Sequence, residues 1–533
     1  MLETQCSSMR ELHQIHSQMI KTGLAKDPIA ISRLLTFTTT AAPSADLDYA
    51  RRLFNRTRHP TLFMWNTLIR AFSGSSNPSL AISLFREMLL SPTQPNGLTF
   101  PSLFKAYTHL GLSTNDGSQL HAMVLKLGLA SDPFIHNSML SMYACCGELA
   151  VASQLFDRCL GFDVVACNAM LLGLAKMGFI DESRHLFDEM PERTVVSWSS
   201  MISGYVRNRR NKEAFDLFHQ MQRERVKPNE HIMVSLLAAC SSLGALEHGK
   251  WIHSYIEENY GLAINPIMMT AIVDMYCKCG SIEEALEAFE IAPVKSLSSW
   301  NSMILGLATH GRGEQAIRLF RRLQYSTPGL RPDYVSFISI LTACSHSGMI
   351  EEAFEYFKLM VKTYSIEPGI EHYGCLVDAL GRAGLIEEAR NLIARMPMEP
   401  DSIIWGSLLS ACRIHRHVDI GNEAAGKVLE LDPCDSGSYV ISSNTYAIAD
   451  DIDGATKLRW LMKEKRLRKE MGCSVIELEG EVHEFVASGV MHKSATEIFQ
   501  ALNSLLLNIR DAAEVNSDES LHDSQTNSID EVP

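Results

Sequence analysis

The sequence predicts an all-α fold, a solenoid of helix-turn-helix repeats, with one small β-hairpin near the carboxyl end. Two observations support this prediction. A unit of 35 residues, Val195 to Asn229, carries two amphipathic stretches separated by a polar break. Units with the same pattern follow one another without linkers from residue 28 to residue 401. Repeats of this length are typical of solenoids, in which stacked neighbours bury the apolar face that one hairpin cannot bury alone.

The unit from Val195 to Asn229 defines the register of the repeat. Each half places apolar residues at helical spacing. These residues are Trp198, Met201, Ile202 and Tyr205 in the first half, and Ala214, Leu217, Phe218 and Met221 in the second. The polar residues 208–211 separate the two predicted helices. Pro228 disfavours helical geometry at the residue before it, so the second helix is predicted to end there.

Ten further units align on this register. Two have nearly the same length, Leu62–Asn96 and Leu297–Asp333. Shorter units of 31 residues are Pro133–Asp163, Val164–Thr194 and Pro266–Ser296. Longer units of 36 residues are Gly97–Asp132, Glu230–Asn265 and Tyr334–Gly369. Pro28–Thr61 and Ile370–Asp401 complete a set of eleven.

The segments on either side of the repeats have other patterns. Residues 1–27 match the later half of a long unit, so they are expected to be a truncated first repeat. Residues 402–470 are expected to form helical hairpins that lack the Pro-Asp ending. In residues 471–510, two alternating runs around Glu479-Gly480 predict a β-hairpin, and a last amphipathic helix is predicted to end at Arg510. Residues 511–533 hold seven acidic residues and no Lys or Arg, which predicts a disordered tail.

The repeats resemble the pentatricopeptide repeat (PPR). The sequences WNTLI, LFREM and QPN in one unit, and WNSMI, AIRLF and RPD in another, carry this resemblance. The alternation of long and short units is similar to the plant PLS subclass. AAGKVLELDP followed by YVISSNTYA resembles the E extension of that subclass, and the β-hairpin region resembles its E-plus segment. The resemblance implies a right-handed superhelical solenoid that binds single-stranded RNA in a chloroplast or mitochondrion, although no transit segment is visible in this chain.

In this family the fifth and last residues of each repeat read one RNA base. Seven units carry hydrogen-bonding side chains at both positions. The resemblance therefore implies RNA-base-reading residues Ser32/Thr61, Asn66/Asn96, Asn137/Asp163, Asn168/Thr194, Ser199/Asn229, Thr270/Ser296 and Asn301/Asp333. The long units have Pro101, Val234 and Ile338 at the fifth position, and the last unit has Gly374 with Asp401, so these four are not expected to read bases by this code. Each polar pair could also be a solvated helix start and an ordinary helix cap.

The net charge of −14 leaves two interpretations open. An acidic chain is a poor non-specific binder of nucleic acid, because neutralisation of phosphates drives that mode of binding. A protein-binding helical scaffold without RNA is therefore one alternative, and a selective RNA reader with local basic residues is the other. The thirteen Cys are expected to be small buried side chains, since the chain has no CxxC spacing for a metal.

Zinc deaminases need an H-x-E and a downstream P-C-x-x-C to hold the metal and move the proton. Both are missing from this sequence, so we expect it to lack the DYW deaminase domain that follows the E-plus segment in many members of the family it resembles. We therefore predict a non-enzyme that needs no cofactor. The expected function is an organellar factor that selects sites for C-to-U RNA editing and recruits a deaminase in trans. A role in RNA splicing, processing or stability is the alternative that retains RNA binding.

Overall fold

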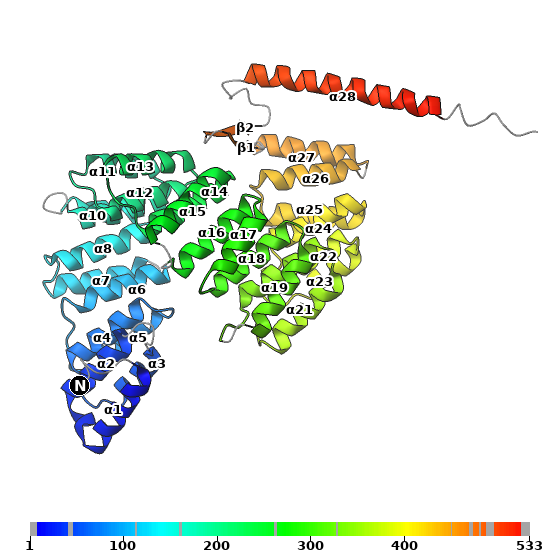
Figure 1. The fold of residues 1–533 in the computed structure, drawn as a ribbon. Helices are drawn as coiled ribbons and strands as arrows, with labels where there is room; N and C mark the ends of the chain where they lie inside the picture. The colour runs from blue at the N-terminus through cyan, green and yellow to red at the C-terminus, as the bar shows by residue number, and fades with distance from the viewer. Residues whose placement is uncertain are drawn as a thin grey trace, which may run out of the picture. The chain divides into compact units, whose positions relative to one another are not determined.

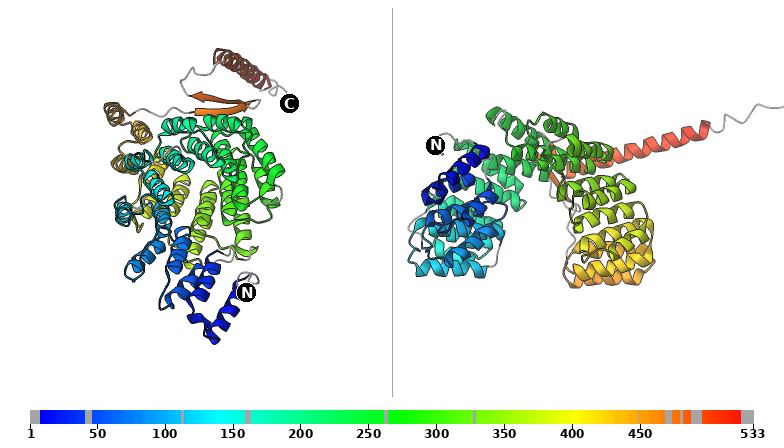
Figure 2. Two further views of the ribbon diagram at one scale, coloured as in Figure 1. Left: turned by 90° about the vertical axis from the view of Figure 1, so that its left-hand side faces the viewer. Right: turned by 90° about the horizontal axis from the view of Figure 1, so that it is seen from below.

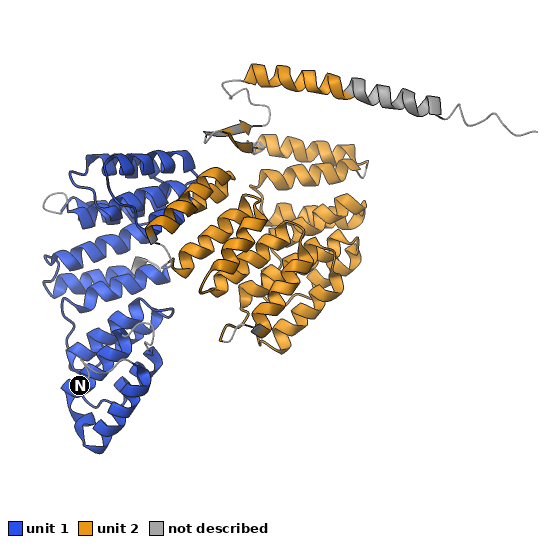
Figure 3. Cartoon of the chain, in the orientation of Figure 1, with its two compact units in different colours: residues 1–236 blue, residues 237–533 orange. Residues whose placement is uncertain are grey.

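The structure is a computed structural model. It describes residues 8–523 apart from 41–45, 112–113, 159–162, 261–263, 327–328, 449, 468–472, 479–480 and 487–494. The chain divides into two compact units, residues 1–236 and residues 237–533 (Figure 3). Almost every element is an α-helix (Figure 1). The prediction of an all-α solenoid is therefore confirmed.

The first unit consists of antiparallel helix pairs. After α1 (Met9–Lys21) and the short 3₁₀-helix η1 (Leu24–Lys26), the pairs are α2 (Pro28–Thr40) with α3 (Leu47–Asn55), α4 (Leu62–Ser73) with α5 (Ser79–Leu89), α6 (Thr99–Leu110) with α7 (Thr114–Lys126), α8 (Pro133–Cys146) with α9 (Leu149–Phe156), α10 (Val164–Lys176) with α11 (Ile180–Glu189), and α12 (Val195–Arg207) with α13 (Asn211–Arg223). Figure 2 shows these pairs stacked one after another from two further sides.

The second unit continues the pattern, and its boundary falls within α14 (Glu230–Leu243). The helices after α14 are α15 (Leu246–Tyr260), α16 (Pro266–Lys278), α17 (Ile282–Ile291), α18 (Leu297–Thr309), α19 (Gly313–Ser326), α20 (Tyr334–His346), α21 (Ile350–Lys362), α22 (Ile370–Arg382), α23 (Ile386–Ala394), α24 (Ser402–His415), α25 (Val418–Leu431), α26 (Ser436–Ile448) and α27 (Ile452–Glu464). No helix among the described residues is long and apolar enough to cross a membrane.

The first helix of each pair begins where a sequence unit begins, except that α6 starts at Thr99, two residues into its unit. The reason is local. The last residue of most units is an Asp, Asn, Ser or Thr, and its side chain can cap the next helix. Asp132 and Asn265 accept hydrogen bonds from backbone N–H groups of α8 and α16, and Pro133 and Pro266 occupy the first helical position.

A Trp–Phe contact recurs between successive repeats. Trp65 of α4 meets Phe54 of α3, and Trp198 of α12 meets Phe187 of α11, with ring centroids 4.6 and 5.0 Å apart in edge-to-face geometry. In the second unit Trp300 of α18 meets the Phe289 ring of α17 at 4.9 Å. All three Trp side chains are buried. Because each ring pair joins the second helix of one repeat to the first helix of the next, it stabilises the stack rather than a single hairpin.

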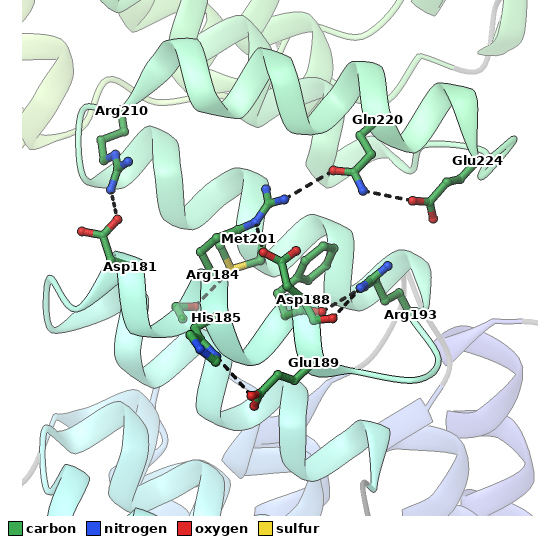
Figure 4. A network of polar contacts seen from close by, with 12 residues as sticks. Asp181, Arg184, His185, Asp188, Glu189, Arg193, Met201, Arg210, Gln220 and Glu224 are labelled. Atoms are coloured by element: carbon green, nitrogen blue, oxygen red, sulfur yellow. Dashed lines mark hydrogen bonds and ion pairs between the residues drawn. The ribbon is translucent and has the colours of Figure 1, made fainter.

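Polar contacts join the second helices of neighbouring repeats. Arg210, the residue before α13, forms an ion pair with Asp181 of α11, and Arg184 of α11 contacts both Asp188 and Gln220 (Figure 4). Arg210 also forms an ion pair with Glu213 of α13. These contacts lie on second helices, whereas the polar residues expected to read bases lie on first helices. Exposed ion pairs of this kind contribute little to stability, so the solenoid depends mainly on its apolar core.

Close helix packing requires glycine at repeated positions of the first helices. A Cβ atom added to Gly173 of α10 would lie 2.5 Å from Ala144 Cβ of α8. The same substitution at Gly381 of α22 would place Cβ 2.8 Å from Ala411 Cβ of α24. The glycines therefore allow neighbouring first helices to approach each other, which agrees with a structural role.

We expect Gly381→Ala to destabilise the second unit by about 1–3 kcal/mol, the usual cost of forcing an extra methyl group into a packed interface. Gly406→Ala in the neighbouring helix α24 is the matched control, because no atom lies within 4 Å of its added Cβ. That variant should gain up to about 1 kcal/mol from helix propensity. Urea denaturation of both variants measures the difference, and equal stabilities would contradict the close approach.

The carboxyl part departs from the repeats. Strands β1 (Cys473–Leu478) and β2 (Glu481–Val486) pair antiparallel, with Ile476 opposite His483, so the predicted β-hairpin is present. Its predicted turn, Glu479-Gly480, lies outside the described residues. The last helix, α28, spans Ala495–Asp523.

The prediction that the last helix ends at Arg510 and that a disordered tail begins at residue 511 is wrong for residues 511–523, which continue α28. This stretch contains neither Gly nor Pro, and Ala and Glu are good helix formers, so intrinsic propensity continues the helix where apolar spacing has stopped. The rest of the acidic tail, residues 524–533, lies outside the described residues.

Candidate nucleic-acid interface

The seven predicted fifth residues all lie near the start of first helices, on α2, α4, α8, α10, α12, α16 and α18. The last residues lie just before the next first helix, and several cap it. Asn229 Oδ1 accepts from the backbone N–H of Ile232 at 3.0 Å, and Asp333 Oδ1 accepts from that of Ser336 at 2.9 Å. The last residue therefore both caps the next first helix and lies close to the fifth residue, because it stands directly before that helix.

The structure joins four of the seven pairs by side-chain hydrogen bonds. Asn66 Nδ2 donates to Asn96 Oδ1 at 3.0 Å, Asn137 Nδ2 to Asp163 Oδ2 at 2.6 Å, and Asn301 Nδ2 to Asp333 Oδ1 at 3.1 Å; Thr270 Oγ1 lies 3.2 Å from Ser296 Oγ. In each pair, the fifth residue and the last residue belong to the same repeat. Two side chains about 30 residues apart in the sequence thus form one polar site per repeat.

No such bond joins the other three pairs. Ser32 Oγ donates to the Pro28 carbonyl of its own helix at 2.7 Å, and Thr61 caps α4. Thr194 Oγ1 lies 3.3 Å from Ser197 Oγ, while the buried Asn168 Oδ1 has no hydrogen-bond partner. In the Ser199/Asn229 unit, Asn229 is engaged as a cap. An unpartnered buried amide oxygen such as that of Asn168 is a free acceptor.

Within the first unit the first helices α6, α8, α10 and α12 line an open groove of about 640 Å³. The fifth residues Asn137 and Asn168 lie in it, together with Lys105 of α6, which supplies positive charge. The fifth residue of the long unit, Pro101, also lines the groove but offers no hydrogen-bonding side chain. The groove therefore combines two candidate base-reading side chains with a cation that could bind a phosphate.

Sequence reasoning missed the second residue of each unit. Phe134, Val165 and Val196 line the same groove and are 80%, 59% and 56% exposed. Large apolar side chains are also exposed at the second residue of other units, at Phe63, Ile267 and Val335. These residues could have been recognised from the sequence as apolar residues at a constant position that falls outside the buried stripe. Val196, for example, lies two residues before the buried Trp198. Such surfaces can stack on nucleobases, whatever the base.

The buried cysteines are unsuited to nucleophilic chemistry, whereas Cys434 is exposed, contrary to the expectation of a buried side chain. Cys240, Cys344 and Cys412 are buried. Burial raises the pKa of the Cys344 thiol to about 12 and that of Cys412 to about 11, so both are protonated thiols at neutral pH. Within the described part of the chain, no group of three or more His, Cys, Asp or Glu could hold a metal ion.

His253 and His310 are packed between neighbouring repeats. His253 Nδ1 lies 3.0 Å from the Tyr276 hydroxyl, and burial lowers the pKa of His253. His310 Nε2 lies 2.8 Å from the Cys277 carbonyl oxygen, so this nitrogen donates. Both rings tie one repeat to its neighbour rather than lining the groove.

Comparison with known proteins gives a consistent result. Models of the PPR repeat family and the PPR repeat match residues 60–109, 134–164, 165–195, 193–242, 267–291, 298–326, 335–363 and 371–399, and the E motif matches residues 415–477. A chloroplastic pentatricopeptide repeat-containing protein of Arabidopsis thaliana is 53% identical over 507 residues, which cover 95% of this chain and 90% of that protein. A mitochondrial pentatricopeptide repeat-containing protein from the same plant is 34% identical, over 96% of this chain and 89% of that protein.

Among solved structures, PPR10 from maize matches with a TM-score of 0.40 and 18% identity, over 87% of this chain and 77% of that one. PPR10 in complex with an 18-nt psaJ RNA element matches with a TM-score of 0.40 and 16% identity, over 83% and 75%. The sequence matches, the repeat register and the polar pair at the end of each repeat agree with one another: this chain belongs to the pentatricopeptide repeat family and carries an E motif after its repeats.

Proposed function

We propose that this protein binds a specific single-stranded RNA in a chloroplast or mitochondrion, with one base at each polar pair. The observation that carries the proposal is the recurring site in which a fifth side chain and a last side chain are joined by a hydrogen bond, as in Asn137–Asp163 and Asn301–Asp333. An amide offers a donor and an acceptor to a base edge. The exposed apolar second residue beside it supplies a stacking surface.

RNA fits this arrangement better than a protein partner. A scaffold surface would need no hydrogen-bonding pair at a constant register, and the pairs are missing from the long units, whose fifth residues are apolar. The net charge of −14 does not oppose selective binding, because stacking and base-edge hydrogen bonds supply the affinity there. Relatives named chloroplastic or mitochondrial support an organellar compartment.

We further propose that the bound RNA is a substrate for C-to-U editing and that the E motif and the following segment recruit a deaminase supplied by another protein. The chain is a repeat protein and not an enzyme, so the chemistry would be supplied in trans. The E motif, matched over residues 415–477, supports a recruiting role because it lies outside the units that carry the polar pairs. A role in splicing, processing or stability is the second candidate, supported by the same RNA site.

Organellar transcript sequencing in a line that lacks this protein tests the function directly. Loss of one or a few C-to-U events, with splicing and transcript ends unchanged, is the expected result. Changed splicing or transcript ends with all editing intact would favour the second candidate. Unchanged transcripts, together with no RNA retained by the purified protein, would favour a protein scaffold.

The purified chain should convert no cytidine to uridine, with or without added Zn²⁺. The physical reason is that the sequence has no H-x-E with a downstream P-C-x-x-C to hold the metal and transfer the proton. An RNA that the protein binds is incubated with it and sequenced, with an active zinc deaminase as the positive control. Zinc-dependent deamination by the isolated protein would contradict the proposal that the deaminase acts in trans.

A further inference from the structure

In the two polar pairs Asn66/Asn96 and Asn301/Asp333, a buried hydroxyl lies beneath the amide oxygen of the Asn fifth residue. It belongs to the third residue of the following repeat. Ser336 Oγ donates to Asn301 Oδ1 at 2.7 Å, and Thr99 Oγ1 donates to Asn66 Oδ1 at 2.8 Å. Both Ser336 and Thr99 are fully buried, and Asn301 is 6% exposed. The side chain expected to contact RNA is therefore held from below by a group that RNA does not reach.

The hydrogen bonds fix the orientation of the Asn301 carboxamide. The Asp333 carboxylate can only accept, so the amide nitrogen must face it, at 3.1 Å. The amide oxygen then faces Ser336, whose hydroxyl proton satisfies it. Ser336 Oγ also lies 2.8 Å from Asp333 Oδ1, but that oxygen already accepts two hydrogen bonds, from the Ser336 backbone N–H at 2.9 Å and from Asn301 Nδ2 at 3.1 Å. Held at both ends, the amide has one N–H left to offer.

The chain contains a natural comparison. Asn137 and Asp163 are the same pair, with Asn137 Nδ2 2.6 Å from Asp163 Oδ2. The third residue of the next repeat is Ala166, which is fully buried and has no hydroxyl. The Asn137 carboxamide is therefore anchored at its nitrogen alone. With one hydrogen bond an amide can pivot about that bond, whereas with two its plane is fixed.

We propose that the third residue of the following repeat is a positioning residue that sets how strictly the fifth residue selects its base, with Ser336 acting through Asn301 and Thr99 through Asn66. This inference rests on the proposed RNA-binding function. A fixed amide that presents only an N–H suits a base carbonyl, as on uracil. An amide free to pivot can also turn its oxygen to the amino group of cytosine. Two identical Asn/Asp pairs in this chain thus differ in selectivity.

The test uses exchanged variants, Ser336→Ala and Ala166→Ser. Affinities are measured at fixed salt for the full chain with RNAs that differ only at the base opposite Asn301 or only at the base opposite Asn137. Ser336→Ala should lower the preference for uridine over cytidine at the Asn301 position about three- to tenfold, the equivalent of one net hydrogen bond. Ala166→Ser should raise the same preference at the Asn137 position by a similar factor. Neither variant should change the preference at the other position.

Ser336 also accepts a hydrogen bond from the Asp333 backbone N–H, so its loss weakens a helix cap. Ala166→Ser has no such effect and is decisive if Ser336→Ala unfolds. A merely structural role would weaken all RNAs equally, or leave selectivity unchanged in both variants, and either result overturns the inference alone. If the unmodified chain shows no base preference at either position, the proposed function falls and the inference falls with it.

Discussion

Asn301→Thr is expected to change the preferred base opposite one repeat from uridine to guanosine. The family resemblance implies that an Asn/Asp pair such as Asn301/Asp333 favours uridine and that a Thr/Asp pair favours guanosine. In the structure the substitution removes the amide that bonds Asp333 Oδ1 and accepts from Ser336. The loss of one good base contact should cost about 1–3 kcal/mol on uridine, a value transferred from readout of duplex DNA.

Binding to four RNAs that differ only at that base measures the change, at one salt concentration because affinity for phosphates depends on salt. Asn137→Thr is the matched control, since Asn137/Asp163 is the same pair in another repeat. It should change the preferred base only at its own position. The repeat with Ser199 and Asn229, for which the resemblance implies a preference for adenine, should be unaffected. If Asn301→Thr weakens all four RNAs equally, Asn301 is a structural residue and the proposed register is wrong.

The sequence was sufficient to predict the helical hairpins and, apart from α6, where the first helix of each begins. Their signals are local: an apolar stripe such as Trp198, Met201 and Ile202, and a capping residue followed by Pro133 or Pro266. The end of α28 could not be predicted in the same way. The helical spacing of apolar residues stops near Arg510, but the helix continues to Asp523. Intrinsic helix propensity acts without a buried apolar face, so the apolar pattern does not reveal this extension.

The candidate site was only partly predictable. Register alone identified the fifth and last residues, but it could not distinguish Asn137, which reaches Asp163, from Asn168, whose amide oxygen has no partner. That difference depends on side-chain geometry across two repeats. The exposed second residues, such as Phe134, were missed because an apolar residue in a helix is first assigned to the core. The buried Ser336 was missed for the converse reason, since its partner is 35 residues away.

A chain that ends at Glu470 should bind its RNA as tightly as the full chain but should support no editing in vivo. The truncation removes β1, β2 and α28, and none of these elements carries a polar pair. Among the described residues of this segment, Glu477 of β1 contacts the repeats. Its side chain is 6% exposed, and it accepts from the backbone N–H groups of Glu247 and His248 at 2.8 and 3.1 Å.

That contact lies at the start of α15, the second helix of a long unit whose fifth residue, Val234, has no hydrogen-bonding group. Its loss exposes one helix end to water, which can satisfy the freed N–H groups, so the affinity for RNA should change by less than about twofold. Glu477→Gln is the matched control: it weakens this contact and retains the whole segment, and it should retain editing. RNA affinity of the purified chains and editing in a complemented line are the two measurements. A large loss of affinity on truncation would place residues 471–533 in the RNA site, and editing by the truncated chain would exclude them from recruitment.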